Sequence, residues 1–406
     1  MAVMGHDIKQ QQLTEGSPRR LLRLGSRLLE NAYAQDGTLL LRVGARIQTL
    51  SELERLRRPD VRFGEHRAAE IPFDMDNEAA LDETDAQPDP RAAEFAKKIE
   101  KATGLKQEAV ADVEWVFTAA DAGEAVDLKL ARRTVAALLT DLLDDPRALV
   151  SLAELKDADA YTYTHSVNVS ILGMHLALHT EHRKDIEDIG VGALLHDIGK
   201  AQMPARILNK QGPLDSAEMQ EMKRHPEIGL QRLKQSGETR PVVLSCVLSH
   251  HEKVSGKGYP QGRRGRHICP YAMVISIADI YDALTTDRPY RSAMDPKEAL
   301  LLMARKMRED LHDGLLQCFV SIVGYYPVGS EVELSNGFKG RVLKHYASRP
   351  NEPTIVLVSD DDDRPIPGSH VVDLAGERGV SILRFVEGNK GFCVARGLVD
   401  ETDKAA

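Results

Sequence analysis

Five histidines and two aspartates are spread over about 115 residues of this chain, in segments whose hydrophobic spacing is otherwise helical. They are His165, His196, Asp197, His225, His250, His251 and Asp279. Imidazole and carboxylate together suit first-row ions such as Fe, Mn, Zn, Co and Ni. Seven ligands exceed what one ion of roughly four to six ligands accepts, so the pattern predicts two metals. Two metals about 3.5–4 Å apart form a clamp for phosphoryl chemistry. A fold that gathers these residues would therefore be helical and would hold a two-metal centre.

The composition of the chain limits its partners. It has 406 residues, 42% of them hydrophobic and 28% charged, which suits a soluble globular protein of two or three domains. The net charge of −9 argues against broad binding to nucleic acid, which requires a basic face.

Residues 167–178 form the longest apolar stretch, but Asn168, Ser170 and His175 interrupt it. This stretch predicts a buried helix, and no membrane span is expected.

The cysteines and the first residues predict a cytoplasmic location. Cys246, Cys269, Cys318 and Cys393 are widely spaced and form no C-x-x-C motif, which is typical of reduced thiols. Residues 1–20 are polar and mixed in charge, without the apolar core of a signal peptide.

The first quarter of the chain predicts a small module and a linker. Residues 1–66 form an expected N-terminal β-containing module of unknown role, with a strand over 37–44 and a short helix over 50–56. Residues 67–90 are predicted to be an acidic linker. From residue 68 this segment holds eight acidic residues, three prolines and no Lys or Arg, so it cannot bury enough apolar area to order itself.

The rest of the chain is predicted to be helical and then β. Residues 91–148 form an expected helical connector, and 149–324 a helical domain that contains all seven candidate ligands. Residues 325–406 predict a β appendage with a tail, because 328–334 alternate in polarity and 353–359 form another strand. The predicted fold class is mainly α: an all-helical core with a small N-terminal β-containing module and a small C-terminal β appendage.

The His196-Asp197 pair and the nearby Lys200 suggest a division of roles. Adjacent helical residues point about 100° apart, so the pair could grip different sides of a metal cluster. The two oxygens of Asp197 could bridge two ions, and the ions would lower the pKa of a water held between them. Lys200 could contact a phosphate oxygen or protonate the leaving group.

A His-Asp pair alone carries little information, since His6-Asp7 and His312-Asp313 also occur. We set both aside. Four other histidines are predicted to be structural or at the surface: His175, His179, His182 and His267.

The candidate ligands and the residues around them form an ordered series of short motifs. They are Tyr161 to Ser166, Leu195 to Lys200, His225-Pro226, His250 to Glu252, Gly258-Tyr259-Pro260, Asp279 to Thr285 and Asp287 to Arg291. Over residues 150–330 this set resembles the HD-GYP family, the bacterial cyclic di-GMP phosphodiesterases of the HD superfamily. The resemblance implies hydrolysis of cyclic di-GMP to pGpG, GMP or both, by a hydroxide that bridges two divalent metals, most often iron or manganese.

The resemblance also assigns roles to single residues. One metal would be held by His165, His196, Asp197 and Asp279, and the second by Asp197, His225, His250 and His251. Asp197 and Lys200 would be catalytic, and the substrate contacts would be Lys200, Arg288 and Arg291. Guanidinium groups suit the last task because they bind phosphate or a guanine edge with two hydrogen bonds.

The loop Gly258-Tyr259-Pro260 is expected to have a structural role or to bind a partner. We expect Gly258 to permit a positive φ and Pro260 to rigidify the turn. Tyr259 either contacts a GGDEF-domain protein, as the family implies, or packs to close the turn. Members usually carry Asp-Gly-Ser/Thr just before this loop. Here the segment is Ser255-Gly256-Lys257, and the lost carboxylate is expected to weaken the anchoring of the loop.

The number of metals, the activity and the substrate each have an alternative. Some members bind a third metal through a Glu, but Tyr161 occupies that position here, so we expect two metals. The chain could instead be a weakly active or inactive adaptor that binds cyclic di-GMP and acts through protein contacts. It could also act on cyclic GMP-AMP or pGpG. The input signal and any homodimer formed through residues 1–66 are not decided by composition.

Overall fold

The computed structural model describes most of the chain from residue 31 to residue 386. The described residues are 31–35, 39–41, 45, 47, 49–58, 60–64, 90–154, 161–208, 210, 212–287, 292–366, 370–377 and 379–386. The chain divides into two compact units. One comprises 1–87, 332–340 and 354–384, and the other comprises 88–331, 341–353 and 385–406. All seven candidate ligands belong to the second unit, which we call the helical unit.

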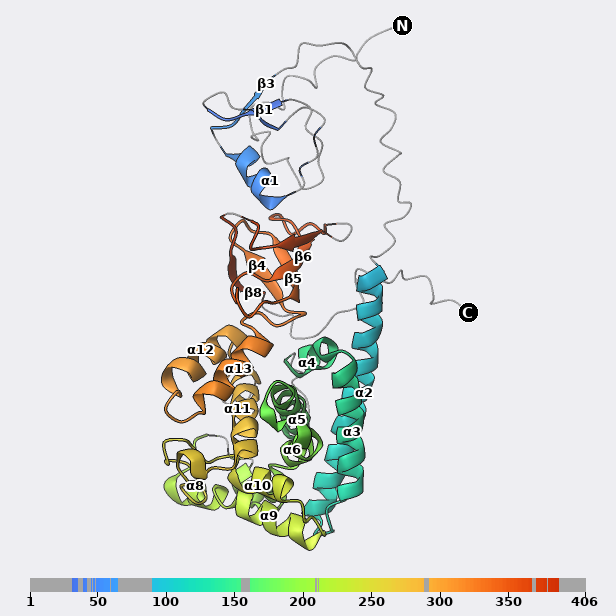
Figure 1. The fold of residues 1–406 in the computed structure, drawn as a ribbon, viewed down its shortest axis with the longest axis vertical. Coiled ribbons are helices and arrows are strands. Elements are labelled where there is room, and N and C mark those ends of the chain that lie inside the picture. Colours follow the sequence, from blue (N-terminus) through green and yellow to red (C-terminus); the bar gives the residue numbers. More distant parts are fainter. Residues whose placement is uncertain are drawn as a thin grey trace, which may run out of the picture. The chain divides into compact units, whose positions relative to one another are not determined.

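The helical unit confirms the mainly α prediction (Figure 1). Its α-helices are α2 (Pro90–Asp121), α3 (Leu128–Asp144), α4 (Pro146–Glu154), α5 (Tyr161–Leu178), α6 (Ile186–Leu194), α7 (Ala205–Leu208), α8 (Ser216–Met222), α9 (His225–Gln235), α10 (Pro241–Ser249), α11 (Pro270–Thr285), α12 (Pro296–Lys306) and α13 (Asp313–Val323). Three short 3₁₀ helices join them: η3 (Glu181–Asp185), η4 (Ile198–Gln202) and η5 (Gly265–His267).

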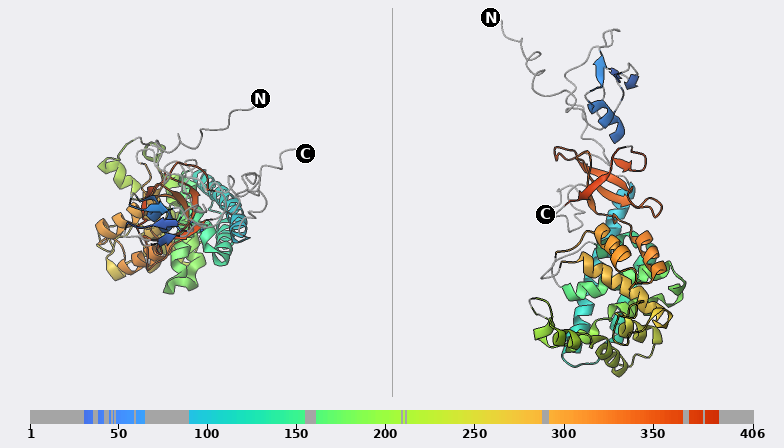
Figure 2. Two further views of the ribbon diagram at one scale, coloured as in Figure 1. Left: turned by 90° about the horizontal axis from the view of Figure 1, so that it is seen from above. Right: turned by 90° about the vertical axis from the view of Figure 1, so that its left-hand side faces the viewer.

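Helix α5 lies at the centre of this unit. It packs against α2, α4, α6 and α11, and every residue from 165 to 177 is buried. The predicted buried helix is thus confirmed, and its polar side chains are enclosed with it. Helices α2 and α3 pack side by side along one flank of the unit, and Figure 2 shows them together from two further directions. They share one hydrophobic core with α5, α6 and α11, so the predicted connector contributes to the packing around the candidate ligands.

The N-terminal module has the expected mixture of strands and helix. Strands β1 (Asn31–Tyr33), β2 (Leu39–Leu41) and β3 (Arg62–Gly64) form an antiparallel sheet of order β2-β1-β3. Helix α1 (Leu50–Arg57) matches the predicted helix. It begins with a capping box in which Thr49 Oγ1 accepts from the Glu52 N–H and Glu52 accepts from the Thr49 N–H.

The C-terminal strands also match the prediction. They are β4 (Glu331–Leu334), β5 (Lys339–Lys344), β6 (Thr354–Ser359), β7 (Val371–Asp373) and β8 (Ile382–Phe385). The sheet has the order β7-β6-β5-β4-β8. Burial alternates along β4, β5 and β6, as it does when one face of a sheet packs on a core. The segment boundaries proposed from the sequence remain predictions.

Two further predictions concern the described residues. None of the helices described is both long enough and apolar enough to cross a membrane. Cys246, Cys269 and Cys318 are free thiols, and Cys393 lies outside the described residues.

Candidate metal centre

Separate elements deliver the seven predicted ligands to one place. His165 lies on α5 and Asp279 on α11. His196 and Asp197 lie between α6 and η4. His225 is the first residue of α9, and His250 and His251 follow the last residue of α10. His251 is half-buried and the other six are buried.

Asp197 stands between two groups of possible ligand atoms. One group contains His165, His196 and Asp197, and the other contains Asp197, His225, His250 and His251; within each, the atoms lie within 4.8 Å of one another. The Oδ2 atom of Asp197 is 3.3 Å from His196 Nε2, and its Oδ1 atom is 3.2 Å from His225 Nε2. The two oxygens thus face different groups, which is the geometry of a bridging carboxylate.

Asp279 completes the set on the other side. Its Oδ1 atom is 3.3 Å from His165 Nε2, and its Oδ2 atom is 3.9 Å from His251 Nδ1. The structure therefore brings together all seven residues that the sequence singled out.

The backbone orients three of the imidazoles. The Nδ1 atoms of His196, His225 and His250 each lie 2.6–2.9 Å from the carbonyl oxygen of the residue three positions earlier. An Nδ1–H that donates to a carbonyl leaves Nε2 as the atom with a free lone pair. In all three rings this Nε2 faces the Asp197 carboxylate, so each ring presents its ligand atom to the centre.

The electrostatics of the centre fit a bound cation. His196 Nε2 and Asp197 Oδ1 are buried without a hydrogen-bond partner. The Nε2 atoms of His225 and His250 lie only 3.2 Å apart. Burial lowers the pKa of His225 to about 4 and that of His251 to about 3, and it holds the pKa of His250 well below its usual range. These imidazoles are therefore neutral near pH 7, and neutral imidazole is the form that binds metals. The residues present fit two divalent metals.

The Asp197 carboxylate stays ionised despite its burial. Burial alone would raise the pKa of Asp197, but Lys200 and the neighbouring imidazoles hold it well below its usual range. Lys200 Nζ lies 2.5 Å from Asp197 Oδ2, and about 30% of the lysine side chain is exposed. Lys200 thus contacts the centre and the solvent at once.

The sequence of the chain matches characterised families. The HD domain family model matches residues 147–316. The chain is 36% identical over 291 residues to "Cyclic di-GMP phosphodiesterase PA4108" of Pseudomonas aeruginosa, covering 71% of this chain and 70% of that protein. The chain belongs to the HD-GYP family.

Two further relatives of this HD-GYP chain cover different shares of it. The chain is 36% identical over 161 residues to "3′3′-cGAMP-specific phosphodiesterase 1" of Vibrio cholerae, covering 38% of this chain and 36% of that protein. A solved structure, an HD-GYP-type protein called Bd1817 from Bdellovibrio bacteriovorus, is similar at a TM-score of 0.47 and 21% identity. That likeness covers 74% of this chain and 96% of the Bd1817 chain.

His165 is held by residues to which the sequence analysis gave no role. Its Nδ1 atom lies 2.6 Å from Asp282 Oδ2, and Asn168 Nδ2 donates to Asp282 Oδ1 at 2.9 Å. Burial would lower the pKa of His165, but hydrogen bonds to Asp279 and Asp282 raise this pKa to about 9. Asp282 follows Asp279 by three residues, and Asn168 follows His165 by three. This i, i+3 spacing was the available signal, because it places both pairs on shared helical faces.

Replacing Asp282 by asparagine is expected to weaken metal binding about 10–100-fold. The neutral amide would hold the imidazole of His165 less firmly. The measurement is Mn(II) affinity by titration of the metal-free protein, with Asp188→Asn as a control because Asp188 pairs with Arg132 and Arg240 instead. Excess metal should restore turnover in the Asp282 variant, and unchanged affinity would contradict the positioning role.

The Gly-Tyr-Pro loop of this HD-GYP chain packs against the candidate metal centre. The ring of Tyr259 lies over His251, with centroids 4.7 Å apart and planes 33° apart, and Lys223 Nζ lies 5.5 Å from the Tyr259 centroid. Tyr259 is half-buried, and burial raises its pKa. The packed alternative is the one observed. The GGDEF contact remains a prediction.

The expectation for Gly258 was wrong. The φ angle of Gly258 is not positive. Glycine is needed at this position because backbone atoms pack closely around it. A Cβ at this position would lie 2.4 Å from Lys253 N and 2.5 Å from His251 O. Glycine therefore allows the loop to fold back onto the segment that carries the ligands.

Carboxylates do anchor this loop. Glu252 accepts from the backbone N–H groups of Gln261 and Arg263, at 2.8 and 2.9 Å. Asp310 accepts from Ser255 Oγ at 2.5 Å and from Lys253 Nζ at 2.8 Å. Asp310 is thus a carboxylate contact for the segment that lacks the family's usual aspartate. Sequence reasoning missed it because it lies 55 residues away along the chain.

Three predicted features lie beyond what the structure describes. Arg288 and Arg291 fall outside the described residues, and so does the side chain of Tyr161. The substrate contacts and the absence of a third metal remain predictions.

Proposed function

We propose that this chain is a metal-dependent phosphodiesterase that hydrolyses cyclic di-GMP. The observation that carries the proposal is the Asp197 carboxylate, whose two oxygens face two separate groups of imidazoles. Such a site suits two divalent metals and hence hydrolysis of a phosphodiester. The relative from Pseudomonas aeruginosa, which covers 71% of the chain, supports cyclic di-GMP as the substrate.

Seven side chains would hold the metals, which we propose are iron or manganese. They are His165, His196, Asp197 and Asp279 for one ion, and Asp197, His225, His250 and His251 for the other. Bound there, the two ions would acidify a water and neutralise charge on the phosphoryl oxygens.

The chain's own residues prepare the site for this reaction. Burial keeps three imidazoles neutral, and Lys200 keeps the Asp197 carboxylate ionised. In the proposed hydrolysis a water releases one proton to solvent and its oxygen bonds to phosphorus, the bond from phosphorus to the ribose 3′ oxygen breaks, and that oxygen takes up a proton. Lys200 is the proposed donor of this proton, or of a hydrogen bond to a phosphoryl oxygen, because its ammonium is partly exposed beside the centre.

Replacing Lys200 by methionine is expected to lower turnover about 100-fold or more while leaving metal content unchanged. Methionine keeps the unbranched shape but removes the charge and the proton. Elemental analysis and turnover should be measured together, with Lys234→Met on the exposed face of α9 as a matched control. A variant that loses metal as well would show that Lys200 supports the ligands rather than the reaction.

The direct test is hydrolysis under anaerobic conditions. Full-length protein is loaded with Fe(II) or Mn(II), and cyclic di-GMP products are followed by chromatography. We expect pGpG, GMP or both. Absence of product with two metals confirmed per chain would reject the enzyme and favour the nucleotide-binding adaptor.

Substrate choice within this chemistry needs a separate measurement. The Vibrio cholerae relative named for 3′3′-cGAMP makes this cyclic dinucleotide a second candidate. Competition between equal concentrations of both nucleotides gives the ratio of their kcat/KM values. We expect cyclic di-GMP to be preferred. A GGDEF-domain partner, a homodimer and a cytoplasmic location remain predictions.

A further inference from the structure

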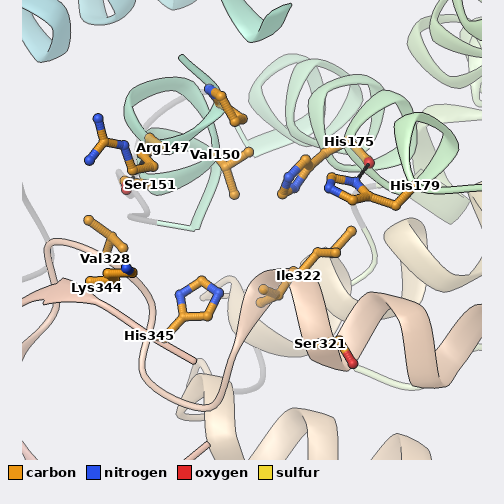
Figure 3. Close-up of a pocket in the computed structure, with 12 residues that line it drawn as sticks. Arg147, Val150, Ser151, His175, His179, Ser321, Ile322, Val328, Lys344 and His345 are labelled. Atoms are coloured by element: carbon orange, nitrogen blue, oxygen red, sulfur yellow. Dashed lines mark hydrogen bonds between the residues drawn. The ribbon is translucent and has the colours of Figure 1, made fainter. Parts of the chain in front are cut away.

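The helical unit contains a hollow that is lined by none of the proposed metal ligands (Figure 3). It is a cavity of about 340 Å³ among α4, α5, α13 and the end of β5. This volume lies within the range of small-molecule sites, roughly 300–1,000 Å³. Its lining includes Val150, His175, Ile322, Val328, Lys344 and His345. All of them belong to the helical unit.

Two imidazoles face this cavity with a nitrogen unused. His175 is only 6% exposed, and its Nδ1 atom has no hydrogen-bond partner. The Nδ1 atom of His345 is likewise buried and unpartnered. Figure 3 shows the two rings on opposite sides of the hollow. A buried polar group without a partner is destabilising, so the two unpartnered nitrogens point to a ligand.

The remaining walls define what kind of molecule would fit. Val150, Ile322 and Val328 supply apolar surface. The charged side chains that line the cavity are Arg147 and Lys344, both exposed, and the lining includes no carboxylate. Arg147 is engaged with Asp145 at 2.7 Å, and Lys344 Nζ lies 4.9 Å from the ring centroid of Tyr346. An apolar interior with cations and polar imidazoles suits an anion that has a hydrocarbon body.

We propose that this cavity binds a small organic acid, with its apolar body between Val150 and Ile322 and its carboxylate near His175, His345 and Lys344. An imidazole N–H can donate to a carboxylate, and the ammonium adds favourable charge. From the sequence, His175 was predicted to be structural or at the surface. The cavity gives it a ligand-binding role. This role could not be read from the sequence, because the neighbours of His175 in the cavity lie on separate elements, α4, α13 and β5.

The cavity and the metal centre share one helix. His175 follows His165 by ten residues on α5, which is about 15 Å along a helix. An occupant of the cavity would therefore contact the same rigid element that carries a proposed metal ligand. Binding itself requires no metal and no turnover, so this inference stands or falls separately from the proposed phosphodiesterase activity.

The probe for this site is octanoate, compared with octanol and octylamine of the same chain length. Binding to the full chain is measured by calorimetry. We expect octanoate to bind with a Kd of about 1 mM or tighter, and octylamine to bind at least tenfold more weakly because the lining includes cations and no carboxylate. Equal binding of the acid and the amine would overturn the proposal.

Three variants locate the binding. Ile322→Trp fills the hollow from a partly buried position and should abolish octanoate binding. His175→Phe replaces the imidazole by a phenyl ring, which has no nitrogen, and should weaken binding about tenfold. Lys344→Glu should weaken octanoate about three- to tenfold and leave octanol unchanged. Lys306→Glu makes the same charge change on α12 and should leave binding unaltered. Octanoate binding that survives both Ile322→Trp and His175→Phe, in folded protein by circular dichroism, would place it elsewhere and overturn the proposal.

Discussion

Asp197→Ala is expected to reduce the hydrolysis of cyclic di-GMP by at least about 1,000-fold and to lower the metal content below two per chain. The reason is geometric: one carboxylate contacts both groups of imidazoles, at 3.3 Å from His196 and 3.2 Å from His225. Losing a ligand that serves one metal would leave the other in place, whereas losing the bridge affects both. Turnover is measured by chromatography of the nucleotides and metal content by elemental analysis of the same samples.

The chain provides its own matched control for this substitution. His312-Asp313 is a second His-Asp pair, at the start of α13, where Asp313 forms an ion pair with Arg308. Asp313→Ala should retain full turnover and both metals. Asp197→Asn keeps the side-chain volume and should behave like Asp197→Ala if charge and bridging matter. Substantial turnover in both Asp197 variants would mean that the reaction does not depend on a bridged pair of metals.

The candidate ligands could be picked out from the sequence because their chemistry is local. Histidines are few, with 14 in the chain, and the candidate ligands occur in recognisable motifs. The sequence showed the order of these motifs along the chain but not the distances between them in the fold. The mainly α core, the helix α1 and the strands β4 and β6 followed from periodicity and turn residues in the same way.

What the sequence left out depends on tertiary packing. The roles of Asp282 and Asp310 arise only in the fold, which places their carboxylates beside His165 and Ser255. The glycine at 258 was correctly seen as special but for the wrong cause, because backbone atoms from elsewhere in the loop, rather than a turn conformation, exclude a side chain. The cavity beside His175 is made by four elements that no local pattern connects.

Gly199→Ala is expected to destabilise the protein by about 3 kcal/mol or more, or to prevent folding. A Cβ at this position would lie 2.0 Å from the carbonyl oxygen of His225 and 2.7 Å from Gly229 N. Both are backbone atoms, which cannot rotate away as a flexible side chain would. To relieve the clash, η4 and α9 would have to separate, and this would move Asp197 away from His225. Urea unfolding of the metal-free protein measures the loss of stability.

Gly104→Ala is the control that separates this clash from the general effect of replacing glycine. Gly104 lies on the exposed face of α2, and a Cβ there would meet nothing within 4 Å. Because alanine favours a helix over glycine, this variant should be about 1 kcal/mol more stable than the wild type. The two substitutions are chemically identical and should therefore act in opposite directions. If Gly199→Ala instead matched the wild type in stability and metal affinity, the close approach of η4 to α9 would not be what holds Asp197 against His225.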